Sequence, residues 1–156
     1  MIVNGYLIGP DVNLAGVNLA GANLTDAKLT GADLEGARLS GADLTGASMY
    51  RIILFTADLT GVNLTGANLE SAHLNGADLT NANMTYADLT YADLTYADLT
   101  GANLTNTNLT GATLTNTNLT GATLTNANLT GANMFRAIGT KANLSGATMP
   151  DGTIHD

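Results

Sequence analysis

The most constraining feature of the sequence is a five-residue repeat that runs from Val12 to Pro150 without a net insertion or deletion. Each repeat has a bulky apolar centre: of the 28 successive centres from Leu14 to Met149, 23 are Leu, four are Met, and only Gly139 is small. Alanine stands two residues before the centre in 22 of these 28 repeats. A period of five matches neither the 3.6-residue turn of an α-helix nor the two-residue alternation of a straight strand. The chain must therefore bend once per repeat so that its leucines and alanines share one interior.

The corners of this bent chain are predicted at the second residue after each centre. Gly, Asn and Asp gather there, as at Asp26, Gly31 and Asn106, because these residues tolerate turn dihedrals best. Short sides bent at regular corners predict a β-solenoid of either hand. From Gly101 to Gly131 the corner alternates between Gly and Asn with a period of ten, so a four-sided coil of 20 residues stacks Asn106 on Asn126. We expect about seven coils and a rod roughly 34 Å long, at roughly 4.8 Å per coil.

The tandem order of small residue, Asp or Asn, Leu, Thr and Gly resembles the pentapeptide-repeat family. Gly21 to Thr25, Gly41 to Thr45 and Tyr91 to Thr95 show the pattern. The resemblance implies an all-β fold, a right-handed quadrilateral β-helix, in a bacterial and especially cyanobacterial protein. It also implies that some relatives imitate DNA and act on type II topoisomerases, while most have no assigned activity.

The chain is expected to have three segments. Residues 1–11 are predicted to form an N-terminal cap, because Ile2, Val3, Tyr6, Leu7 and Ile8 are apolar enough to cover the first coil. Residues 12–150 form the β-helix, and residues 151–156 form a C-terminal tail. No segment reads as a signal peptide or a membrane span, so we expect a cytoplasmic protein.

Composition narrows the range of partners and chemistry. The chain has no Cys, and its five basic residues stand against 13 acidic ones, for a net charge of −8. Without Cys there is no disulfide framework and no Cys-ligated zinc site. So few Lys and Arg argue against a nucleic acid or an anionic membrane as partner. We expect a basic protein surface as partner, no cofactor or metal, and a monomer or an end-to-end dimer.

Two stretches depart from the repeat. Between Ser48 and Phe55, Ile52 takes an inward position usually held by Ala, and Ile53 takes an outward position usually held by Asp or Asn. Either Tyr50, Ile53 and Phe55 form an exposed apolar patch beside Arg51, or Ile52 forces a bulge over which its neighbours fold. The second stretch lacks a bulky centre at Gly139. Either Ile138 fills that vacancy, or the end of the rod is packed imperfectly.

A third feature is an acidic band near the middle of the chain. With 20-residue coils, Asp58, Asp78 and Asp98 stack on one face about 5 Å apart. Tyr86, Tyr91 and Tyr96 occupy three successive corners, and Asp88, Asp93 and Asp98 follow them on the adjoining sides. The band is a candidate contact surface for a basic partner; alternatively, it is a solvated face that keeps the rod soluble.

These features predict a non-enzymatic structural or protein-binding rod. Ser71, His73 and Asp93 can be drawn as a catalytic group, but the convex side of a solenoid offers no water-excluding pocket or oxyanion hole. The acidic band and the patch from Tyr50 to Phe55 are the candidate binding surfaces. The alternative is a DNA-mimicking regulator of a DNA-binding enzyme such as a type II topoisomerase, which would need an acidic stripe that continues across a dimer.

Overall fold

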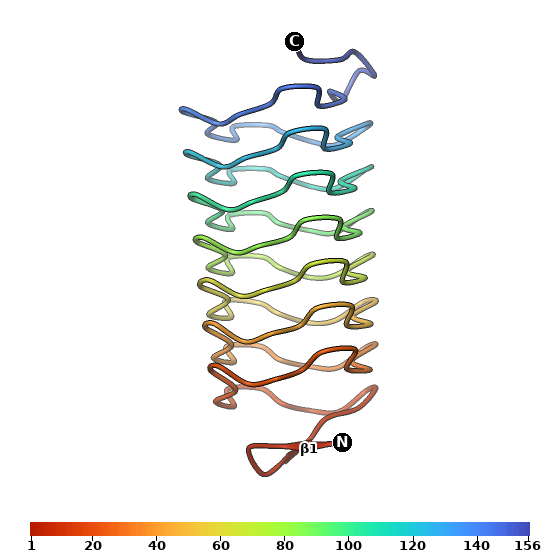
Figure 1. Ribbon diagram of the computed structural model, residues 1–156, viewed down its shortest axis with the longest axis vertical. Helices are drawn as coiled ribbons and strands as arrows, with labels where there is room; N and C mark the ends of the chain where they lie inside the picture. Colours follow the sequence, from red (N-terminus) through yellow and green to blue (C-terminus); the bar gives the residue numbers. More distant parts are fainter.

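The computed structural model describes residues 1–156 and shows a right-handed quadrilateral β-helix, which confirms the predicted fold class (Figure 1). The coils stack along one long axis, with the chain termini at opposite ends of the rod. Successive coils are joined by parallel bridges between residues 20 apart, such as Asn13 with Asp33 and Asp78 with Asp98. Each coil therefore has 20 residues and four sides, and about seven coils make up the rod.

Each side ends in a tight turn. The N–H of Ala97, for example, donates to the carbonyl of Leu94 at 2.9 Å across such a turn. Only the third residue of the turn has a positive φ, as a type II turn requires: 64° at Gly21 and 57° at Asn106. Between coils, the N–H of each centre from Leu14 to Leu129 donates to the carbonyl of the outward residue one coil later, as Leu94 does to Thr113 at 2.8 Å. The corner preference in the sequence therefore reflects a left-handed backbone conformation.

The interior is a single apolar core of 46 residues that runs from Ile8 to Ala132. Almost every Leu centre and inward Ala within that range is fully buried. Thr107 and Thr117 take inward positions in place of Ala, and both are buried. Their hydroxyls donate to the carbonyl oxygens of Met84 at 2.7 Å and Leu94 at 2.8 Å. These hydrogen bonds offset the cost of burying two polar groups.

The bulge hypothesis for Ile52 is wrong. Ile52 is fully buried, its N–H donates to Met49 in the ordinary turn at 3.1 Å, and Ile53 keeps its register with His73. The inward residues one coil before and one coil after Ile52 are Ala32 and Ala72. These small neighbours leave room for the larger side chain.

Ile138 does not fill the vacancy at Gly139. It pairs with Asn118 on the outside of the rod, and 54% of it is exposed. The side chains of adjacent residues along an extended side point in opposite directions, so Ile138 cannot turn inward without losing its register. The last coil is consequently open, and its centres Met134 and Leu144 are only half-buried.

Both termini fold against the rod. Strands β1 (Ile2–Val3) and β2 (Tyr6–Leu7) form an antiparallel hairpin at the N-terminal end. Ile8 is buried and Val3 packs against the core, whereas Ile2 is 75% exposed. At the other end, residues 151–156 turn back and Ile154 pairs antiparallel with Thr148. No helix in the structure has the length and apolar character needed to cross a membrane.

Candidate protein-binding surface

The four sides of the rod differ in the outward residues that they stack. We call them faces 1 to 4 in chain order, and we define each by its ladder of bridged residues. The ladders are Asn13, Asp33, Ile53, His73, Asp93, Thr113 and Asn133 on face 1; Asn18, Arg38, Asp58, Asp78, Asp98, Asn118 and Ile138 on face 2; Asn23, Asp43, Asn63, Asn83, Asn103, Thr123 and Asn143 on face 3; and Lys28, Ser48, Asn68, Asp88, Asn108, Asn128 and Thr148 on face 4.

Face 2 stacks Asp58, Asp78 and Asp98 in consecutive coils, as the 20-residue period predicts. Each carboxylate accepts the N–H of the Thr two residues later, at 3.1, 3.0 and 2.9 Å. The pKa of Asp58 lies below its usual value, first because the Thr60 hydroxyl donates to it at 2.7 Å, and further because Arg38 adds an attractive charge. Asp88, in contrast, lies on face 4 and Asp93 on face 1. The acidic band thus extends over faces 4, 1 and 2 and is not confined to one face.

The three tyrosines of the band occupy three different corners of one coil. Tyr86, Tyr91 and Tyr96 are 66%, 65% and 69% exposed, and each has a positive φ of about 60°. The Tyr91 ring lies over Gly111, the corner residue one coil later, at a position that a Cβ would fill. Because one side of the rod joins only two corners, a flat partner can contact two of these tyrosines at most.

The patch from Tyr50 to Phe55 exposes less apolar surface than expected. Tyr50 is 38% exposed, while Ile53 and Phe55 are half-buried. The Phe55 ring packs against the ring of His73, one coil later, with centroids 5.6 Å apart and planes inclined at 47°. The patch therefore continues along face 1 into the next coil.

Face 1 joins this patch to the acidic band. Ile53, His73 and Asp93 are consecutive members of its ladder. Burial tends to raise the pKa of Asp93. However, hydrogen bonds from the Thr95 hydroxyl and the Asn75 side chain, together with the charge of His73, outweigh burial and hold the pKa below its usual value. The two regions that the sequence treats as separate candidates form one continuous surface.

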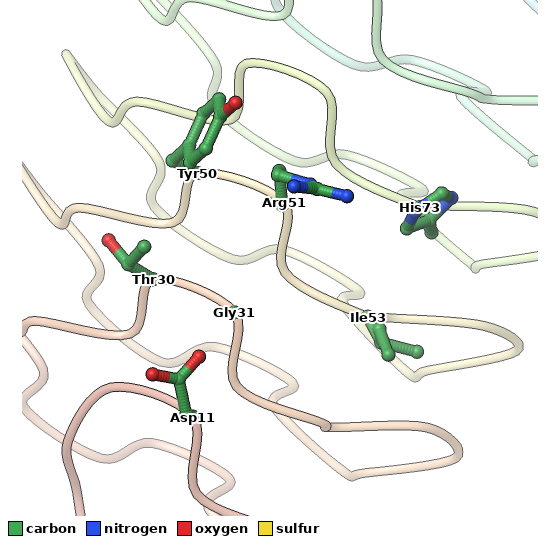
Figure 2. Close-up of a pocket in the computed structure, with 7 residues that line it drawn as sticks. All are labelled: Asp11, Thr30, Gly31, Tyr50, Arg51, Ile53 and His73. Atoms are coloured by element: carbon green, nitrogen blue, oxygen red, sulfur yellow. The ribbon is translucent and has the colours of Figure 1, made fainter.

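A surface pocket of about 380 Å³ opens at the corner where face 4 meets face 1 (Figure 2). Asp11, Gly31 and Arg51 stand one above another along this corner, 20 residues apart. Gly31 leaves a notch into which the Asp11 carboxylate leans. The walls are Thr30 and Tyr50 on one side, and Ile53 and His73 on the other. Sequence reasoning missed the contributions of Asp11 and Thr30, although their 20-residue offsets from Gly31 and Tyr50 could have revealed them.

The titratable side chains of this region are engaged in local contacts. The His73 ring packs against Phe55, and Asp93 accepts hydrogen bonds from Thr95 and Asn75. No three side chains of His, Cys, Asp or Glu are grouped so that they could hold a metal ion together. Aromatic, aliphatic and guanidinium groups beside a pocket are instead typical of protein-binding hot spots.

The profile of the family described as pentapeptide repeats matches residues 11–51, 57–95, 87–126 and 117–151, in eight copies. Among solved structures, HetL is a pentapeptide repeat protein involved in heterocyst differentiation regulation, from the cyanobacterium Nostoc sp. It is 32% identical over 94% of this chain and 92% of its own, with a TM-score of 0.52. A pentapeptide repeat protein of the Arabidopsis thaliana thylakoid lumen is 31% identical over 62% of this chain and 68% of its own, with a TM-score of 0.61.

QnrB1, a plasmid-mediated fluoroquinolone resistance protein, covers 90% of this chain and 81% of its own length with a TM-score of 0.69. Its identity is 14%, so this likeness shows a shared fold only. The search of curated proteins found no match.

Proposed function

Since the chain belongs to the pentapeptide-repeat family, as its repeat predicts, we propose that it is a non-enzymatic rod that binds a partner protein through face 1. The binding surface includes the corner formed by Asp11, Gly31 and Arg51, which we call the Arg51 corner. The observation that supports this proposal most directly is that the one surface pocket and the apolar departures from the repeat at Ile53 and Phe55 lie together there. HetL, a relative with a regulatory role, supports a binding function rather than a catalytic one.

Face 3 provides the contrast. Its outward residues are almost all Asn and Thr, and these bond to one another along the rod. Asn63 donates to the Thr45 hydroxyl at 2.9 Å, and Asn83 donates to the Thr65 hydroxyl at 3.0 Å. Side chains that satisfy one another within the ladder leave few groups for a partner to engage. Face 3 therefore serves as the comparison surface, on which we expect no partner contact.

Face 1, in contrast, presents apolar side chains that are available to a partner. Tyr50, Ile53 and Phe55 supply apolar area, and aromatic rings lose little conformational entropy when a partner covers them. A partner that covered face 1 would bury these apolar groups.

Photo-crosslinking tests this function. A photoreactive amino acid would replace Ile53 on face 1 and, in a separate variant, Asn63 on face 3, and each protein would be irradiated in cytoplasmic extract, the compartment in which we propose that it acts. We expect a discrete adduct from position 53 at about 0.15 M salt and none from position 63. The same adducts from both positions, or none from position 53, would contradict the proposal.

The acidic band can be tested in the same extract. Changing Asp58, Asp78 and Asp98 together to Asn preserves their shape while removing three aligned charges. If the band steers a basic partner, partner retention by the wild-type protein falls as salt rises, and that of the triple variant is weaker and nearly independent of salt. If the band serves solubility alone, the two proteins retain the same partner equally.

The aspartate column of face 2 is also the observation that favours the second candidate, a DNA-mimicking regulator of a DNA-binding enzyme. Three carboxylates in consecutive coils form a short line of negative charge. The positively charged Arg38, in the preceding coil, lies at one end of this line. DNA supercoiling by a type II topoisomerase measures this activity. The candidate requires that the wild-type protein alters supercoiling and that the triple Asn variant does not.

A further inference from the structure

We infer that face 1 binds a polypeptide segment whose charges run basic, acidic, basic along the rod, with its acidic residue seated against Arg51. This inference rests on the proposed function and specifies the chemistry of the partner. It differs from the simple expectation that a protein of net charge −8 binds whatever is most basic.

On face 1 and the Arg51 corner, Arg51 lies between carboxylates on both sides along the rod, and Asp11 is the first of these, two coils before it. Asp33 and Glu35 lie in one coil, Arg51 in the next, His73 in the third and Asp93 in the fourth. At roughly 4.8 Å per coil, the carboxylates lie about 5 Å to one side of Arg51 and about 10 Å to the other, measured along the rod. A complementary segment therefore needs a cation at each end and an anion between them.

Arg51 is available for such an anion. Its guanidinium extends across the pocket wall toward His73, and no side chain of the protein forms an ion pair or hydrogen bond with it (Figure 2). Asp11, at the other end of the pocket, is two coils away and leans onto Gly31 instead. Tyr50 and Ile53 line the same pocket and place apolar surface beside Arg51. A carboxylate that entered here would form a charge-assisted hydrogen bond in a setting less polar than the open surface.

The same geometry disfavours two other kinds of ligand. A wholly basic segment would cover Arg51 with like charge and leave the guanidinium unpaired, which costs affinity. A nucleic acid presents an unbroken row of phosphates, and Asp33, Glu35 and Asp93 would repel that row on both sides of Arg51. The apolar neighbours Ile53 and Phe55 favour a segment with aliphatic residues beside its acidic one.

Two fluorescently labelled peptides test the charge order. The first has the sequence Ser-Lys-Leu-Glu-Leu-Lys-Ser-Ser, in which extended geometry places both lysines on the same side of the chain as the glutamate and about 7 Å from it. The second peptide has Gln in place of Glu and is therefore more basic. We expect the Glu peptide to bind the wild-type protein about tenfold more tightly in fluorescence anisotropy at about 0.15 M salt.

Variants of the protein complete the cycle. Arg51→Gln should reduce the preference for Glu to less than about twofold, while the Gln peptide binds this variant at least as tightly as it binds the wild type. Arg38→Gln on face 2 changes the net charge equally and should keep the tenfold preference. Both substitutions are at exposed positions, and circular dichroism and thermal unfolding verify that each variant is folded.

Three outcomes would overturn the inference: no binding of either peptide, equal binding of both peptides to the wild type, or an equal loss of preference in the Arg38 and Arg51 variants. If the peptides fail while position 53 still gives its crosslink, the charge order is wrong and the proposed function stands. If the crosslink fails as well, both are wrong.

Discussion

Replacing Leu94 with Ala tests the assignment of the interior. Leu94 is fully buried in the middle of the rod, between the equally buried Leu74 and Leu114 one coil away on either side. Losing three carbon atoms removes about 2.4 kcal/mol, at about 0.8 kcal/mol per buried methylene. The backbone of Leu94 is held by the N–H bond to Thr113 at 2.8 Å, and its carbonyl accepts the Thr117 hydroxyl. The coils cannot readily collapse into the gap, so the total loss should be about 3 to 5 kcal/mol.

Denaturant unfolding combined with amide hydrogen exchange measures this loss. A solenoid is stabilised coil by coil, so exchange should accelerate most in the coils next to Leu94. The matched control is Leu144→Ala, the same chemical change at a half-buried centre of the open last coil, which should lose less than half as much. Equal losses from the two variants, or a uniform rise in exchange along the rod, would refute the reasoning.

Three further predictions concern the corners, the carboxylates and the end of the rod. Thr56 is a β-branched residue at an exposed corner with a φ of 53°, a conformation that Asn adopts more easily. Thr56→Asn should therefore raise the free energy of unfolding by about 1 kcal/mol in thermal unfolding, whereas the control Thr60→Asn should not. No gain at Thr56 would show that the corner is unstrained. The Thr60 hydrogen bond lowers the pKa of Asp58 below 3.8, so ionised Asp58 stabilises the fold fully above that pH, and this contribution is lost as pH falls through the folded pKa. Asp58→Asn should therefore make the free energy of unfolding depend less on pH below 3.8, and an unchanged acid-unfolding profile would contradict this. We propose that the N-terminal hairpin caps the first coil. A chain starting at Val12 should then melt at a lower temperature and self-associate in size-exclusion chromatography. If that shorter chain were an equally stable monomer, the hairpin would not be a cap.

Much of the architecture is readable from local pattern. The five-residue period separates inward Leu94 from outward Thr95, and the structure buries the first and leaves the second at the surface. The Gly and Asn alternation from Gly101 to Gly131 predicts the 20-residue coil, and the bridge register confirms it. Once the coil length is known, the stacking of Asp58, Asp78 and Asp98 follows by arithmetic. A perfect repeat makes long-range contacts predictable because every contact recurs at one offset.

Sequence reasoning was less reliable where the repeat is broken. Ile52 stays in register because Ala32 and Ala72 leave space above and below it, a relation between three coils that no single repeat displays. Ile138 stays outward because its backbone pairs with Asn118. In both places the backbone ladder, which joins every coil to the next, outweighed the preference of one side chain.

Period, corner chemistry and the regular apolar centres were sufficient to specify the four-sided rod, because they act identically in every coil and need no information from distant residues. The candidate binding surface required the folded molecule. The pocket at Gly31, the contact between the rings of Phe55 and His73, and the continuity of face 1 from Ile53 to Asp93 each depend on how particular side chains from different coils meet. Packing and solvation between coils set the directions of these side chains and the size of the pocket. These interactions exist only in the folded chain.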